Sequence, residues 1–270
     1  DWGNQKITGC FESQISMKKI SGSIMFSALA GLVAAGALTG IYQMPRSIVF
    51  LIAVGLWWLL IALAHWFFSF EKKHLFLHLA TSVTLVSLLS LIEWQPLAWF
   101  IIALSIPLFA FVWHWSAVMS RQHTALSYKT WRRIIMMLWV LNVFGWSGGL
   151  FSLSIFFQHI SHVLLAAVGA TFAAAVAAAN WHVYFDAKIE TFAFWIGTLW
   201  LLAYEIIWVL HYLPLGYFTL GLVFTWIWYL LQLFIRFHLT RGGILWEKQK
   251  VFLISNTALF ISVLYIARWI

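Results

Sequence analysis

Residues 191–213 read TFAFWIGTLWLLAYEIIWVLHYL, an apolar run interrupted by one carboxylate, Glu205. A transmembrane α-helix needs about 20 consecutive, mostly apolar residues to cross the hydrocarbon core of a bilayer. The run has that length, and similar runs recur along the chain between clusters of charge, proline and glycine. The sequence therefore predicts an all-α, polytopic transmembrane helical bundle.

The composition of the 270-residue chain supports the same fold class. Hydrophobic residues make up 63% of the chain and charged residues only 9%, whereas soluble domains carry about 25% charged residues. So few charges do not cover a water-facing surface. The single cysteine, Cys10, excludes an intrachain disulfide and any metal site built on cysteine pairs.

The breaks between apolar runs predict nine membrane spans. The loops between them are too short to fold independently, so residues 17–270 are expected to form one transmembrane domain. Residues 1–16 lack the apolar character of the rest and are interpreted as a non-native or disordered N-terminal extension. The predicted spans are residues 20–42, 47–70, 75–92, 97–119, 134–157, 163–185, 191–213, 215–237 and 251–267.

The basic residues predict the orientation of these spans, because Lys and Arg accumulate in cytoplasmic loops. With the N-terminus inside, all of the 16 Lys and Arg residues except Arg46 and Arg268 fall on the cytoplasmic side. This asymmetry predicts an N-in, C-out protein of a cell membrane, with a bacterial cytoplasmic membrane as the expected location. It also explains the net charge of +8 without nucleic acid as a partner.

The first span has an alternative interpretation as a cleaved signal peptide. Residues 28–30, Ala-Leu-Ala, match a small-residue cleavage site, and cleavage would leave eight spans. However, the apolar stretch over residues 20–42 is longer than the roughly 7–15 residues of a signal sequence. Its length favours a retained helix.

Glu205 is the most informative candidate site residue. A charged side chain at the bilayer centre costs about 2.5–3.5 kcal/mol on insertion scales, so Glu205 is expected to face protein or water. Thr198, Glu205 and Tyr212 recur every seven residues and share one helical face, with Trp208 beside them. The alternative is a protonated Glu205 that only stabilises helix packing.

The predicted fifth span offers a second polar surface, which includes Asn142, Trp146 and Ser147. Glycines 145, 148 and 149 are a candidate interruption of this helix, which would free main-chain groups to act as ligands. Together with Glu205 and Thr198, these residues predict a polar, outward-opening cavity between the fifth and seventh spans. The alternative is that the glycines only admit a bulky neighbour.

Small residues predict close helix packing elsewhere in the chain. Gly36 and Gly40 in the first span have the G-x-x-x-G spacing, and the sixth span is rich in small side chains. Those expected to lie at a helix contact are Ala166, Gly169, Ala173 and Ala177.

His74 and His78, four residues apart, are weak candidates for a metal site. Paired with His65, His114 or His182, they would also suit a haem. Spacing alone does not specify either group, so no cofactor is predicted. The alternative is that these histidines lie at the membrane interface with one edge in water.

Three functions remain open. The leading hypothesis is a transporter or permease-like protein for a small solute, ion or lipid, with an intramembrane carboxylate in its pathway. The second is a non-catalytic membrane subunit or scaffold that packs with membrane-protein partners or a second copy within the lipid bilayer. The third is an intramembrane enzyme that acts on lipid or quinone through the cytoplasmic histidines. The sequence lacks a Walker A motif, a G-x-S-x-G elbow and a dinucleotide fingerprint, which disfavours ATP-driven transport by this chain alone. Nothing in the sequence decides between the three functions.

Overall fold

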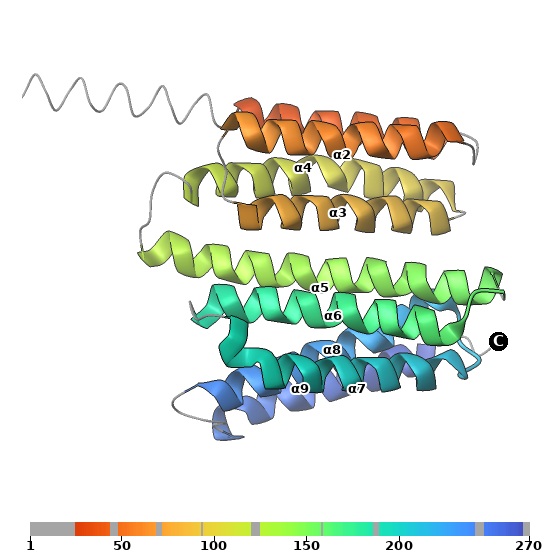
Figure 1. The fold of residues 1–270 in the computed structure, drawn as a ribbon, viewed down its shortest axis with the longest axis vertical. Coiled ribbons are helices and arrows are strands. Elements are labelled where there is room, and N and C mark those ends of the chain that lie inside the picture. Colours follow the sequence, from red (N-terminus) through yellow and green to blue (C-terminus); the bar gives the residue numbers. More distant parts are fainter. Residues whose placement is uncertain are drawn as a thin grey trace, which may run out of the picture. The chain divides into compact units, whose positions relative to one another are not determined.

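The computed structural model describes residues 25–43, 48–68, 72–92, 94–119, 125–157, 159–185, 189–240 and 246–266. The regular elements among these residues are helices (Figure 1). The proposed extension over residues 1–16 lies outside the described residues. The helices are Met25–Gln43, α2 (Ile48–Phe68), α3 (Lys72–Leu91), α4 (Gln95–Met119), α5 (Ala125–Phe156), α6 (His162–Phe185), the short 3-10 helix η1 (Ile189–Phe192), α7 (Ala193–His211), α8 (Tyr217–Leu239) and α9 (Trp246–Ile266).

Seven segments of the described chain are helical, long and apolar enough to cross a membrane. Shorter apolar stretches, Phe50–Trp66 in α2 and Lys250–Ser262 in α9, lie where the other two spans were predicted. The all-helical fold is confirmed, and these helices are those of an integral membrane protein. The count of nine spans and their orientation remain predictions. The seven segments are Met25–Gln43, His74–Leu91, Gln95–Ala117, Thr130–Phe156, His162–Phe185, Glu190–His211 and Tyr217–Leu239.

The chain divides into two compact units, Asp1–Trp131 and Arg132–Ile270. In the first, α3 packs against α2 and α4. The Met25–Gln43 helix lies antiparallel to α4, because its first turn meets the end of α4 and its last turn meets the beginning. Phe26 contacts Trp113 edge-on with ring centroids 5.6 Å apart, and Tyr42 contacts Trp99 at 6.2 Å.

The close approach in this unit is at Gly31, where a Cβ atom would strike the main-chain oxygen of Ile106. A Cβ at Gly36 or Gly40 meets nothing within 4 Å among the described residues, so close packing at this pair stays a prediction. The G-x-x-x-G spacing permits close packing but does not show which face of an apolar helix a neighbour occupies.

The second unit is built around α6. Its small residues Ala166, Gly169, Ala173 and Ala177 are buried, as predicted. α6 packs along α7, and α8 packs against both. The Trp228 indole of α8 donates a hydrogen bond to the main-chain oxygen of Ala173 over 3.1 Å.

Helix α5 runs unbroken from Ala125 to Phe156, so the candidate interruption at its glycines was wrong. Gly148 instead lies against α8, because a Cβ on Gly221 would stand 2.9 Å from the Gly148 nitrogen. This approach brings the Ser147 hydroxyl to 3.2 Å from the Gly221 oxygen and 3.3 Å from the Thr225 hydroxyl. The glycines therefore serve interhelical packing and hydrogen bonding.

Candidate functional site on helix α7

Glu205 lies on an exposed face of α7, within the membrane-length segment Glu190–His211. Leu201 and Val209, one turn to either side, are also exposed, at 51% and 60%. Tyr212 continues the same face at 68% exposure. No described residue donates a hydrogen bond to the Glu205 carboxylate or forms an ion pair with it. Among the described residues, Glu205 is thus a carboxylate without a partner in an apolar surface, which we name the α7 face (Leu201, Glu205, Val209 and Tyr212).

A ladder of aromatic rings runs along α7 beside this face. Trp200 stacks on Tyr204 with ring centroids 5.7 Å apart, and Tyr204 stacks on Trp208 at 6.2 Å. Trp208 then meets Tyr212 edge-on. The Trp200 indole donates to the Thr171 hydroxyl of α6 over 3.1 Å, which fixes one end of the ladder. The rings line α7 next to Glu205, and the Trp200 hydrogen bond links the ladder to α6.

The other residues of the predicted cavity point to different neighbours. Trp146 stacks on Phe172 of α6 at 4.6 Å, and Ser147 bonds to α8. Asn142 is fully buried, whereas Glu205 is exposed. Thr198 shares α7 with Glu205, but its hydroxyl donates to the main-chain oxygen of Phe194 over 2.9 Å. No described hydrogen bond joins Glu205 to the α5 residues, so their role as one pathway stays a prediction.

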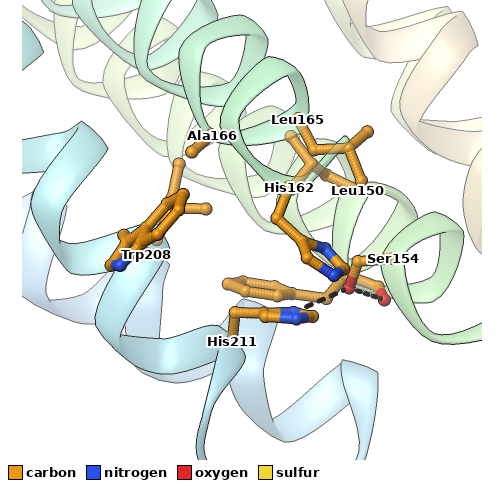
Figure 2. Close-up of a pocket in the computed structure, with 9 residues that line it drawn as sticks. Leu150, Ser154, His162, Leu165, Ala166, Trp208 and His211 are labelled. Carbon is orange, nitrogen blue, oxygen red and sulfur yellow. Dashed lines mark hydrogen bonds between the residues drawn. The ribbon is translucent and has the colours of Figure 1, made fainter. Parts of the chain in front are cut away.

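A small pocket lies where the end of α5, the start of α6 and the end of α7 converge (Figure 2). Its volume of about 10 Å³ is enough for about one water molecule. The imidazoles of His162 and His211 face each other with ring centroids 3.8 Å apart. The lining residues are Leu150, Phe151, Ser154, His162, Leu165, Ala166, Ile207, Trp208 and His211.

Ser154 connects this histidine pair to α5. Its hydroxyl lies 2.8 Å from the main-chain oxygen of Phe151 and 3.3 Å from Nδ1 of His211. A dashed line in Figure 2 marks the contact between Ser154 and His211. The hydroxyl donates its proton to the Phe151 oxygen, and in the tautomer protonated at Nδ1 the His211 ring can donate to Ser154 Oγ at the same time. The cluster joins three helix ends through polar contacts. Sequence spacing does not reveal it, because its members come from three different helices.

In the first unit, the structure brings His78 of α3 against His65 of α2. Their ring centroids are 4.8 Å apart, and Trp113 contacts both rings. His74 lies one turn away and contacts Trp131 at 5.4 Å. Within the described residues, no group of three or more His, Cys, Asp or Glu side chains is placed to hold a metal ion.

The first unit also contains an apolar pocket of about 180 Å³ between the Met25–Gln43 helix, α2 and α4. Trp57, Phe109 and Trp113 form its aromatic wall, and its other lining residues are aliphatic or aromatic. Such a surface is compatible with lipid chains, and the indole N–H groups of Trp57 and Trp113 are the only polar side-chain groups among its lining residues.

Comparison with protein-family models, with curated proteins and with solved structures finds no match for this chain. The functional argument therefore rests on the residues of the α7 face.

Proposed function

We propose that this integral membrane protein is a non-catalytic membrane subunit whose α7 face docks onto another transmembrane helix. The partner helix supplies a cation or a hydrogen-bond donor to Glu205. The observation that supports this proposal is the exposed Glu205 carboxylate inside an apolar, membrane-length helix, where no described residue forms a hydrogen bond or an ion pair with it.

Lipid chains provide no hydrogen bonds, so a carboxylate that faces them loses its solvation without compensation. The apolar neighbours Leu201 and Val209 gain little from leaving lipid, since lipid tails are as apolar as leucine. The polar group therefore supplies the selectivity of the face. It favours a helix that places a Lys, Arg or amide side chain at the same depth over a purely aliphatic helix.

The test uses the full chain in liposomes with a synthetic polyleucine transmembrane peptide that carries one central lysine. Fluorescence energy transfer between a label on the protein and a label on the peptide measures their association. Interhelical polar contacts in model peptides contribute about 1–2 kcal/mol, so Glu205→Leu is expected to weaken association by about 5- to 30-fold. Glu205→Gln is expected to retain part of it through the amide.

The matched control moves the carboxylate to another exposed site. In the Glu205→Leu background, Leu59→Glu places a carboxylate on α2, where Leu59 is 53% exposed. If this variant binds the lysine peptide as well as the native protein does, any exposed carboxylate suffices and the α7 face is not a docking site. Equal binding of the lysine peptide and an all-leucine peptide by the native protein would also refute the proposal.

Transport of a small solute, ion or lipid is the second candidate function. It is favoured by the protonatable side chain of Glu205 within a membrane-length segment, because such groups often serve proton or cation pathways. Glutamine cannot release a proton, so Glu205→Gln is expected to abolish proton-linked flux in proteoliposomes. Unchanged flux would remove Glu205 from the pathway. No observation on the described residues favours the intramembrane enzyme.

A further inference from the structure

Two arginines of the second unit converge on one tyrosine. Cζ of Arg132 in α5 lies 4.8 Å from the ring centroid of Tyr184 in α6, and Cζ of Arg236 in α8 lies 4.7 Å from the same centroid. All three side chains are half-buried. Bringing two guanidinium cations to one ring concentrates positive charge between three helices, which favours an anion there.

The hydrogen bonds of the two arginines differ. Arg132 donates from Nη1 to the main-chain oxygen of Tyr184 over 3.2 Å, near the last residue of α6, which is a favourable place for a cation. Arg236 donates from Nη1 to the Met136 sulfur over 2.8 Å, and a thioether is a weak acceptor. Nε of Arg236 is buried and has no acceptor among the described residues.

A guanidinium group presents its donors in a planar fork that matches the oxygens of a phosphate. The described residues offer Arg236 sulfur and an aromatic ring instead of oxygen acceptors. One arginine is enough to form a cation–π contact with the Tyr184 ring, so this contact alone does not explain why both Arg132 and Arg236 lie there. The neighbouring Arg133 is exposed and shows that this turn of α5 can also direct an arginine to solvent.

The cluster lies at membrane-span ends in every helix that contributes to it. Arg132 follows the start of Thr130–Phe156, Tyr184 precedes the end of His162–Phe185, and Arg236 precedes the end of Tyr217–Leu239. This is the depth at which lipid phosphates lie, and basic pockets between transmembrane helices bind anionic head groups there. We propose that Arg132 and Arg236 form a phosphate-binding site that takes the head group of an anionic phospholipid.

The test measures phosphatidylglycerol binding to the full chain in neutral detergent by native mass spectrometry. Hydrogen bonds to charged groups predict at least about tenfold weaker binding for Arg236→Gln and for Arg132→Gln. Arg133→Gln removes the same charge from the adjacent, exposed position and is expected to bind like the native protein. Equal affinities for all three variants would overturn the site.

Two further variants keep the result interpretable. Arg236→Lys retains the charge but loses the fork, so it is expected to fold and still bind phosphatidylglycerol more weakly than the native protein. Asp186 follows Tyr184 by two residues and lies outside the described residues. If Asp186→Asn binds phosphatidylglycerol and the native chain does not, the arginines are neutralised internally and the proposal is wrong.

Competition with inorganic phosphate shows whether the bound anion is a lipid head group or a soluble phosphate. Arginine-dependent binding of phosphatidylglycerol, with little competition from millimolar phosphate, supports a lipid site. Arginine-dependent binding of inorganic phosphate alone keeps the phosphate site but assigns it to a soluble anion.

Discussion

At the residue scale, the contact between α5 and α8 depends on Gly221. A Cβ there would stand 2.9 Å from the nitrogen and 3.0 Å from the Cα of Gly148, main-chain atoms that cannot move aside. Overpacking of this kind costs about 1–3 kcal/mol. Gly221→Ala is therefore expected to lower the free energy of unfolding by that amount, measured by titration with a denaturing detergent and tryptophan fluorescence.

The partner glycine provides the control for this prediction. A Cβ on Gly148 meets nothing within 4 Å among the described residues, and alanine favours a helix by about 1 kcal/mol over glycine. Gly148→Ala is expected to be neutral or stabilising. If both substitutions destabilise equally, the close contact at Gly221 is not the cause.

The sequence singled out Glu205 as the candidate site residue, but it did not show which face of α7 carries the Glu205 side chain. The cost of a carboxylate in lipid identified Glu205 from sequence alone. In a soluble helix the apolar stripe marks the buried face, but α7 has apolar residues on its exposed face too, including Leu201 and Val209. Hydrophobic periodicity therefore does not show which way Glu205 points.

At the element scale, α5 is expected to behave as one continuous helix. Its main-chain amides around Gly145, Gly148 and Gly149 are bonded within α5 in the structure. Peptides covering residues 143–150 should then exchange amide hydrogens as slowly as peptides covering residues 135–142, measured by mass spectrometry in micelles. Much faster exchange in the peptides that contain the glycines would support the interrupted helix that the sequence predicted and would contradict a continuous α5.

Most helix boundaries were predictable because charge, proline and glycine punctuate apolar runs. The sixth predicted span, 163–185, nearly coincides with α6 (His162–Phe185). The start of α5 was missed: the span was placed at residue 134, but the helix begins at Ala125. Lys129, Arg132 and Arg133 suggested a loop, although long basic side chains can extend from a helix to the interface.

At the scale of the whole molecule, helix neighbours were harder to predict than helices. The sequence paired the fifth and seventh spans around a cavity, and Ser154 of α5 does meet His211 of α7. However, Ser147 of α5 bonds to α8 and Trp146 packs on α6. Apolar helices of similar composition pack through shape and a few polar bonds. These contacts depend on three-dimensional positions that no single span encodes.

The orientation of the chain is testable with single cysteines in a Cys10→Ser background. The distribution of basic residues places Ser161, before α6, outside and Thr240, after α8, inside. A membrane-impermeant maleimide should label Ser161→Cys in intact cells and Thr240→Cys only after permeabilisation. The reverse pattern would show that the predicted orientation is wrong.

A cysteine at the C-terminus tests the span count through α9. The apolar part of α9 over residues 251–266 is about 24 Å long at 1.5 Å per residue, shorter than the roughly 30 Å hydrocarbon core. The bilayer can thin slightly or flanking side chains can extend to its surface, so the helix can still cross at modest cost. If α9 spans, Ile270→Cys is labelled from outside, opposite to Thr240→Cys. Labelling of both positions from the same side would mean that α9 does not cross the membrane.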